Sequence, residues 1–160
     1  MIEAILVPQD RIGVFNKKVH DDLKKKIGIE LKVEGNSVFV EGESLNELIA
    51  RNFVKAVARG FSPQRAHRLL EEEDAQLEII DIGEMSDKRA KIVKSRIIGT
   101  SGKTRNYIEE CTGAVVSVYG NTVSIIGNFE ETQNARQAVD MLINGSMHKT
   151  VYRFLEQVRK

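Results

Sequence analysis

One eight-residue pattern occurs twice in this sequence, and the spacing of its copies constrains the fold more than any other feature. Residues 35–42 read Gly-Asn-Ser-Val-Phe-Val-Glu-Gly, and residues 120–127 read Gly-Asn-Thr-Val-Ser-Ile-Ile-Gly, a shift of 85 positions in a chain of 160. The same shift carries Gly28 onto Gly113. Glycines and alternating apolar residues that keep one register over such a stretch indicate a repeated structural unit. We therefore expect two copies of one fold.

Hydrophobic periodicity predicts the same order of elements in both copies. Each copy begins with a strand, continues through helix to two strands joined by a tight Gly-Asn turn, and ends in a long helix. The expected elements of the first copy span residues 2–7, 16–26, 29–33, 38–40 and a helix from Ser44 onward; those of the second span residues 77–82, 88–98, 103–112, 114–119, 122–126 and 128–143. A short helix within residues 60–73 and a last helix near residues 147–159 complete the chain. The pattern predicts an α+β fold of two domains, residues 1–75 and 76–160.

The long helices carry predicted capping boxes. Ser44 with Glu47, and Asn128 with Glu131, have the spacing at which a cap side chain and a glutamate satisfy each other's backbone N–H groups. Ser62, before Pro63, is expected to cap the short connecting helix. The inner faces of the two long helices are expected to hold Leu45, Leu48, Ile49, Asn52, Phe53 and Ala56 in the first copy and Phe129, Thr132, Ala135, Val139 and Leu142 in the second.

Composition limits the class of protein. The chain is 41% hydrophobic and 29% charged, with a formal net charge of +1, which argues against nucleic-acid binding by bulk charge alone. Its lone cysteine, Cys111, excludes an internal disulfide framework and suits a reducing compartment, so we expect a cytoplasmic protein. The apolar start at residues 1–8 is too short for a signal peptide or a membrane span. Three dispersed histidines offer no metal cluster and no nucleophile–base set, so we expect neither a cofactor nor an enzyme.

A glycine loop in the second copy concentrates the chemistry. Residues 97–105 read Ile-Ile-Gly-Thr-Ser-Gly-Lys-Thr-Arg. Two glycines three residues apart let the backbone turn tightly and let another backbone approach, and the helix that follows points free N–H groups at the loop. Seven cations and no acids lie between residues 88 and 108: Lys88, Arg89, Lys91, Lys94, Arg96, Lys103 and Arg105. This arrangement favours phosphate binding over an ordinary solvated helix face.

A nucleotide-binding P-loop is the rival interpretation, because Gly102-Lys103-Thr104 looks like the end of one. That motif requires a further glycine where this sequence has Ile97, and a strand before the loop where the pattern predicts a helix. The sequence therefore excludes this interpretation.

The second copy resembles the KH domain of type I. The resemblance is carried by Ile97-Ile98-Gly-x-x-Gly-Lys, then Ile108, Thr112-Gly113 and the strand with Val116 and Val118, in the order strand, helix, loop, helix, strand, strand, helix. Residues 96–99, 112–113, 118–120 and 150–155, with the connecting segment 59–70, are similar to one family in particular. These are archaeal ribosomal-RNA-processing proteins related to the partner-of-Nob and Krr small-subunit assembly factors.

The resemblance implies two tandem type I KH domains, each a three-stranded antiparallel sheet with helices on one face, plus a linker helix and a C-terminal helix. It also implies that the protein binds single-stranded RNA near the 3′ end of small-subunit ribosomal RNA. About four unpaired nucleotides would then bind beside the glycine loop. The residues that it assigns to RNA are Lys94, Arg96, Ile97, Ile98, Gly99, Thr100, Ser101, Gly102, Lys103, Thr104, Arg105, Val116 and Val118. Ile108 is a further candidate for the apolar floor, although Ile108 and Val116 are the two most expected to lie in the core.

The first copy departs from this pattern. Shifted by 85 positions, Gly99 falls on Val14 and Gly102 on Lys17, so the two-glycine turn is missing and we expect this copy not to grip RNA in the same way. The alternative function is a protein-binding adaptor built on degenerate KH folds. The resemblance suggests a Nob-type endonuclease and the alpha subunit of translation initiation factor two as partners, and no membrane.

Overall fold

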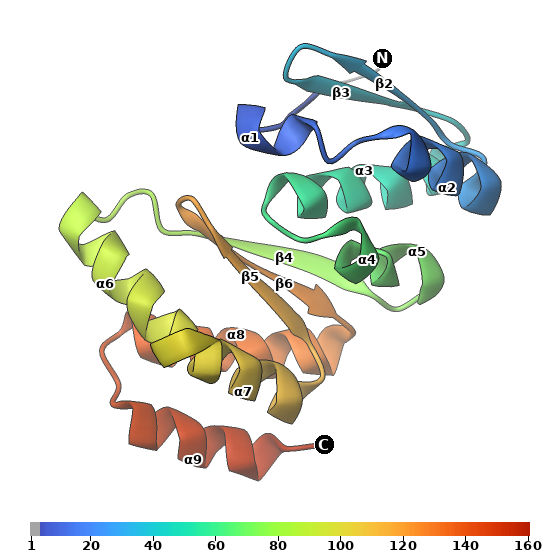
Figure 1. The fold of residues 1–160 in the computed structure, drawn as a ribbon. Helices are drawn as coiled ribbons and strands as arrows, with labels where there is room; N and C mark the ends of the chain where they lie inside the picture. The colour runs from blue at the N-terminus through green and yellow to red at the C-terminus, as the bar shows by residue number, and fades with distance from the viewer. Residues whose placement is uncertain (1–3) are drawn as a thin grey trace. The chain divides into compact units, whose positions relative to one another are not determined.

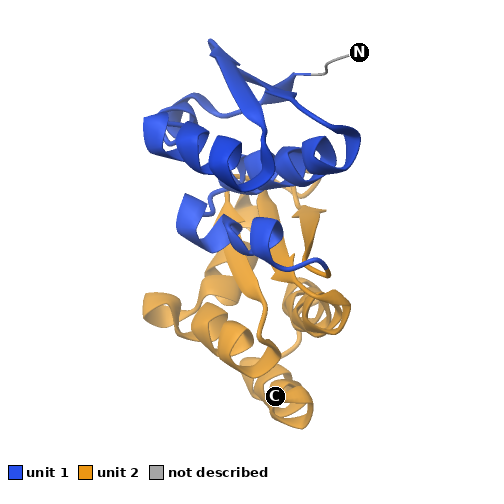
Figure 2. Cartoon of the chain, turned by 90° about the vertical axis from the view of Figure 1, so that its right-hand side faces the viewer, with its two compact units in different colours: residues 1–73 blue, residues 74–160 orange. Residues whose placement is uncertain are grey.

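The computed structural model describes residues 4–160, and the chain divides into two compact units, residues 1–73 and residues 74–160 (Figure 2). Each unit has its own three-stranded antiparallel sheet. Along residues 4–160, no helix has both the length and the apolar character needed to cross a bilayer.

The first unit, unit 1, has the predicted strands and long helices in the predicted order (Figure 1). It also has an unpredicted short helix at residues 9–12, and two short helices instead of one within residues 60–73. The elements are β1 (Ile5–Leu6), α1 (Gln9–Ile12), α2 (Lys17–Ile27), β2 (Glu30–Glu34), β3 (Ser37–Glu41), α3 (Ser44–Ala58), α4 (Pro63–Ala66) and α5 (Arg68–Glu71). Its sheet has the order β1-β3-β2. Within the described part of the predicted strand at residues 2–7, β1 comprises Ile5–Leu6; residues 1–3 lie outside the described residues.

The second unit, unit 2, repeats this topology with a longer first helix (Figure 1). The elements are β4 (Gln76–Asp81), α6 (Asp87–Ile98), a 3-10 turn η1 (Thr100–Gly102), α7 (Lys103–Thr112), β5 (Val115–Tyr119), β6 (Thr122–Gly127), α8 (Phe129–Ile143) and α9 (His148–Val158). Its sheet has the order β4-β6-β5, which corresponds strand for strand to the sheet of unit 1. Helix α6 has twelve residues where α1 has four, so only unit 2 presents a long helix before its loop.

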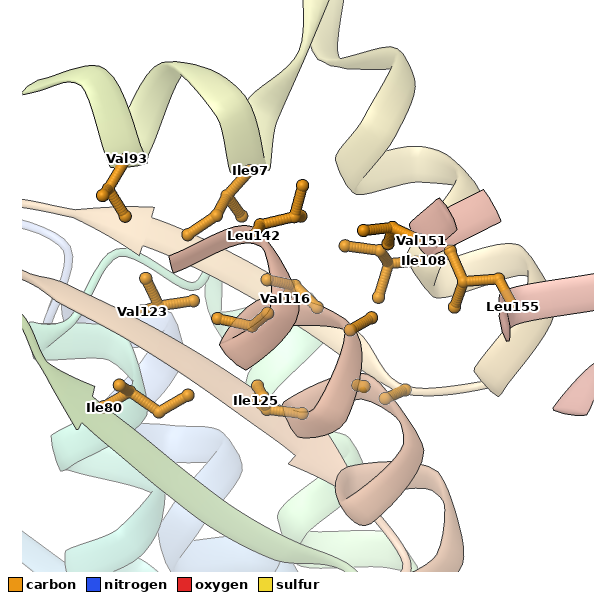
Figure 3. Close-up of a cluster of buried hydrophobic side chains, with 14 of the residues drawn as sticks. Ile80, Val93, Ile97, Ile108, Val116, Val123, Ile125, Leu142, Val151 and Leu155 are labelled. Carbon is orange, nitrogen blue, oxygen red and sulfur yellow. The ribbon is translucent and has the colours of Figure 1, made fainter. Parts of the chain in front are cut away.

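The core of unit 2 lies between its sheet and its helices (Figure 3). Ile97 at the end of α6, Ile108 of α7 and Val116 of β5 are at most 1% exposed. Val151 and Leu155 of α9 are fully buried against the same cluster, so the last helix belongs to the core of this unit. Burying a side chain of this size stabilises the fold by roughly 1.5–3 kcal/mol. The glycine loop is therefore held between two helices that are each anchored in the core.

Two predicted helix caps are confirmed and a third is wrong. The side chain of Ser62 accepts from the Arg65 N–H and caps α4, as predicted. The side chain of Asn128 accepts from the N–H of Glu131 and Glu131 accepts in return, which is the predicted capping box of α8. Helix α3 instead begins at Ser44 itself, after Glu43 as N-cap residue, and no side chain in the described part of the chain caps it. The predicted box of Ser44 with Glu47 is absent because Ser44 already lies inside the helix, where its side chain cannot act as a cap.

The predicted inner face of α3 is also displaced. Leu45 and Leu48 are 71% and 57% exposed, whereas Phe53 and Ala56 are buried as predicted, together with Ala50, Val54 and Val57. The buried positions follow a helical period that is shifted by one residue, because small alanines left the apolar stripe ambiguous. Phe129 of α8, also predicted inward, is 70% exposed, while the rest of its predicted face is buried.

Candidate nucleic-acid interface

The glycine loop between α6 and α7 adopts a backbone that few residues tolerate. Gly99 has φ 73° and ψ 176°, a region open essentially to glycine alone. Ser101 follows at φ 55° and Gly102 at φ 77°, both left-handed. Ser101 is the one non-glycine residue with positive φ among residues 4–160. The chain thus turns tightly within Gly99–Gly102, and α7 begins directly after this turn.

The two glycines are required for different reasons. A Cβ on Gly99 would lie 2.3 Å from Thr104 Oγ1 and 2.8 Å from the backbone nitrogen of Thr104, so the loop closes tightly on α7 there. A Cβ on Gly102 would meet no described atom closer than Asn106 Nδ2 at 3.9 Å. Gly99 therefore serves the packing of the loop, whereas Gly102 leaves open space at the start of α7.

The N-terminus of α7 is open. Among the described residues no side chain caps it, because the N-cap position is Gly102. Ser86 caps α6 by accepting from the Arg89 N–H. The N-terminus of α6 is therefore capped by a side chain, whereas no described side chain caps that of α7. A helix start without a cap keeps its positive dipole end and N–H donors available to an anion. Thr100 and Ser101, at the tip, are exposed.

The cations around the loop divide into two groups. Lys94 lies toward the β5–β6 turn, where its Nζ donates to the Gly120 carbonyl at 3.0 Å and keeps its other N–H donors free for an anion. Lys103 is exposed, and Arg105 has a buried Nε with no partner among the described residues. Lys103 and Arg105 lie in the first turn of α7, directly after the loop, whereas Lys94 lies on α6 before it.

Arg96 has a different role from the predicted one. Its guanidinium donates to the carbonyls of Leu142 and Ser146, which join α8 to α9. Thr104 is likewise 3% exposed, and its hydroxyl is paired with the Tyr152 hydroxyl at 3.1 Å. Both residues were predicted to contact RNA, but their side chains are occupied within the unit because they hold the loop against α8 and α9.

Burial divides the residues of the predicted apolar floor into two groups. Ile97 and Val116 lie in the core together with Ile108, so their side chains cannot face a ligand. Ile98 is 36% exposed and Val118 is half-buried, which leaves these two as accessible apolar surface. Burial alternates along α6 with the helical period, and the sequence alone could not decide which of two adjacent isoleucines pointed inward.

The edge of strand β5 provides donors and acceptors beside this surface. Tyr119 pairs with Thr122 across a two-residue turn, so the alternation of an antiparallel ladder directs the N–H and C=O of Val116 and Val118 away from β6. The Val116 N–H donates to Glu109 Oε2 at 2.7 Å, which confirms this direction. Val118 therefore presents its peptide groups at the sheet edge. Nothing in the sequence had identified Glu109 as the residue that accepts from the Val116 N–H at this edge.

The counterpart loop in unit 1 is closed by its own side chains. Gly13 has φ −68° and ψ −13°, an ordinary helical conformation, so it does not replace Gly99. Phe15 is buried, and the Asn16 side chain accepts from the Val19 N–H and caps α2. The start of α2 thus lacks the open donors that α7 presents.

Other chemistries find little support in the described residues. Residues 4–160 contain no group of three or more side chains arranged to hold a metal ion. Cys111 is fully buried, and burial raises the pKa of its thiol, so it is a poor nucleophile.

Comparison with known proteins finds one matching family and several similar chains. The family described as Eukaryotic type KH-domain (KH-domain type I) matches residues 76–160. A KH domain-containing protein of Methanocaldococcus jannaschii is 41% identical over 170 residues, which cover 99% of this chain and 74% of that protein. The crystal structure of Dim2p from Pyrococcus horikoshii has a TM-score of 0.88 and 40% identity, over 98% of this chain and 99% of the other. A complex of a/eIF2alpha, aDim2p and rRNA from the same organism contains a chain with a TM-score of 0.89 and 38% identity, over 98% and 93% of the two chains.

Proposed function

The chain belongs to the type I KH-domain family, and we propose that it is a non-catalytic protein that binds single-stranded RNA through Gly99–Gly102 of unit 2. The observation that carries this proposal is the open start of α7 directly behind a glycine loop, next to Lys94, Lys103 and Arg105. An uncapped helix start and lysine or arginine side chains are the groups that bind phosphate oxygens.

The surface beside the loop, formed by Ile98 and the edge of β5, accounts for the bases. Phosphates lie at the loop, and the bases then point across Ile98 toward the edge of β5. Val118 supplies an apolar side chain and, at the sheet edge, one N–H and one C=O that can bond a base edge. Duplex RNA does not fit this arrangement, because the bases must be unpaired to reach a sheet edge.

We extend the proposal to the whole chain as two tandem KH folds with unequal roles. Unit 1 has the same strand order and the same sequence of elements as unit 2, which supports a shared fold. Its loop is filled by Phe15 and capped by Asn16, so phosphate has no open helix start to bind there. Exposed Leu6, Leu45 and Leu48 favour protein binding as the task of this unit.

The proposed setting is ribosome assembly in an archaeal cytoplasm. The relatives are archaeal, and one of them forms a complex with rRNA and a/eIF2alpha. We propose that this chain binds the 3′ region of small-subunit ribosomal RNA during its processing, with the alpha subunit of initiation factor two and a Nob-type endonuclease as partners.

Charge reversal at the loop tip tests the proposal. In a Thr100→Asp/Ser101→Asp variant, two carboxylates face the phosphates, while the fold is kept because both positions are exposed and aspartate tolerates the left-handed backbone at 101. The neutral Thr100→Asn/Ser101→Asn variant has nearly the same shape and serves as the matched control. We expect the aspartate variant to lose RNA affinity about a hundredfold, the effect of losing two charge-assisted contacts, and the asparagine variant to stay close to the parent. Equal affinities of the two variants would overturn the assignment of the loop.

RNA recovery separates this function from that of a pure protein adaptor. The tagged full chain should recover small-subunit ribosomal RNA from a cell extract, and the aspartate variant should recover much less. Recovery of proteins without RNA by both would favour the adaptor.

A further inference from the structure

A pocket of about 570 Å³ lies on the side of the glycine loop that faces α9. Its walls come from α6, the glycine loop, the start of α7 and the start of α9. Gly99 and Thr100 line this pocket and also belong to the loop proposed to bind phosphate.

Helix α6 separates this pocket from the surface formed by Ile98 and the edge of β5. Lys94 bonds the Gly120 carbonyl at the end of β5, whereas Arg96, two residues later, bonds carbonyls between α8 and α9 and lines the pocket. Two residues along a helix differ by about 200° in direction, so the two side chains leave α6 on opposite sides. The pocket is thus a second surface next to the same loop.

The chemical character of the pocket matches a nucleotide. Ile92 lines it and is 52% exposed, although it stands in a strongly charged helix. The rings of His148 and Tyr152 form another part of the wall, and Lys91 and Lys103 contribute positive charge. No Asp or Glu occurs among the described residues that line it. Apolar and ring surface next to cations, without acids, is the combination that binds a base together with its phosphate.

The ring wall is fixed in place before any ligand binds. His148 Nε2 lies 3.0 Å from the Arg96 carbonyl oxygen, which can only accept, so Nε2 carries the hydrogen. Tyr152 is held by its hydroxyl bond to Thr104 and by the ring of Tyr107, 4.7 Å away between centroids. A wall that is already ordered loses little side-chain entropy on binding.

We propose that this pocket binds one further unpaired nucleotide of the RNA strand, beyond those at the β5 edge; the proposal rests on the function proposed above. The strand passes over the loop, where Gly99 and Thr100 contact its backbone. The next base then lies against Ile92 and the rings, and its phosphate lies between Lys91 and Lys103. Contact with ring and apolar surface gives little sequence preference, so any base fits.

Calorimetric titration of the full chain with nested RNAs tests this proposal. The probes are a core fragment of about four nucleotides from the 3′ end of small-subunit ribosomal RNA, and the same core with its natural sequence extended at its 5′ or its 3′ end. The test variant is Lys91→Ala/Ile92→Ser, which changes two exposed side chains outside the proposed phosphate and base contacts at β5. Lys55→Ala, an exposed lysine of unit 1, is the control for the loss of one positive charge.

We expect one of the two extensions to raise the affinity of the parent about tenfold, the usual effect of one stacked base. The Lys91→Ala/Ile92→Ser variant should lose that gain and still bind the core as the parent does, and Lys55→Ala should keep the gain. If neither extension raises the affinity, or if the test variant keeps the gain, the pocket proposal is wrong. If the parent binds none of the RNAs, the proposed function itself fails.

Discussion

The hydroxyl oxygens of Thr104 and Tyr152 lie 3.1 Å apart, and this hydrogen bond connects the start of α7, directly after the glycine loop, to α9. Thr104 is also the residue against which Gly99 closes, so one threonine contacts both the loop and the last helix. The ring of Tyr152 packs on Tyr107 of α7 as well. Helix α9 therefore positions the loop through Thr104, although it contributes no residue to the surface at the edge of β5.

Removal of the Tyr152 hydroxyl should destabilise unit 2. In Tyr152→Phe the buried Thr104 hydroxyl loses its partner, and we expect the free energy of unfolding to fall by about 1 kcal/mol. In Thr104→Val/Tyr152→Phe both hydroxyls are absent, so part of this loss should be recovered. Urea denaturation measures both variants. A double variant no more stable than Tyr152→Phe would show that the hydrogen bond does not account for the loss.

The two glycines of the loop should respond differently to alanine. Gly99→Ala places a Cβ against Thr104 in a backbone region closed to alanine, and we expect a loss of about 3 kcal/mol. In Gly102→Ala the new Cβ lies in open space, so only the left-handed backbone is strained, and we expect the free energy of unfolding to fall by about 1 kcal/mol. Thermal and chemical denaturation can compare them. Equal destabilisation would contradict the distinction between a packing glycine and an access glycine.

Lys94 and Arg96 should separate RNA binding from stability. Lys94→Ala removes an exposed amino group, and we expect weaker RNA binding with a change in stability below about 0.5 kcal/mol. Arg96→Ala removes the guanidinium that donates to the Leu142 carbonyl at the end of α8 and to the Ser146 carbonyl between α8 and α9, and we expect a loss of about 2 kcal/mol. Arg96→Lys should recover little, because lysine cannot donate to two acceptors with the geometry of a guanidinium. The reverse pattern in denaturation and binding curves would invalidate these roles.

Salt dependence should report the same division. Each phosphate contact on single-stranded RNA contributes about 0.7 to the slope of log affinity against log salt. Lys94→Ala should lower the slope by about that amount, whereas Arg96→Ala should leave it unchanged if the fold is kept. An unchanged slope for Lys94→Ala would mean that Lys94 does not meet a phosphate.

The Cys111 thiol should be unreactive in the native state. Burial raises its pKa, so less thiolate forms at neutral pH, and the side chain is 0% exposed. With an aromatic disulfide reagent we expect modification only as fast as the protein opens, and at once in denaturant. Rapid reaction of the folded protein would show that the Cys111 thiol is not buried.

The sequence predicted the repeat, the element order and the position of the glycine loop because each has a local signal. Gly28 and Gly113, for example, both close helices in the left-handed conformation, as a repeated C-terminal glycine should. The family resemblance then came from residues whose spacing is fixed by the loop itself.

What the sequence could not give is which side chains near the loop are already occupied. Lys94 and Arg96 are both basic residues of the same predicted helix, so the sequence does not distinguish their roles. Only the fold places two carbonyl oxygens next to Arg96. Ile97 and Ile98 are adjacent and equally apolar, so burial depends on the rotation of α6 by one residue. The shifted face of α3 has the same cause.

We propose above all that unit 2 binds RNA through its glycine loop and that unit 1 does not bind RNA through its counterpart loop. A ¹⁵N-resolved NMR titration of the full chain with an unpaired fragment of small-subunit ribosomal RNA tests it most directly. We predict the largest shifts at the amides of residues 99–105 and of Val118, and little change at residues 13–17. Shifts centred on residues 13–17, or an unaffected loop at saturating RNA, would contradict the account.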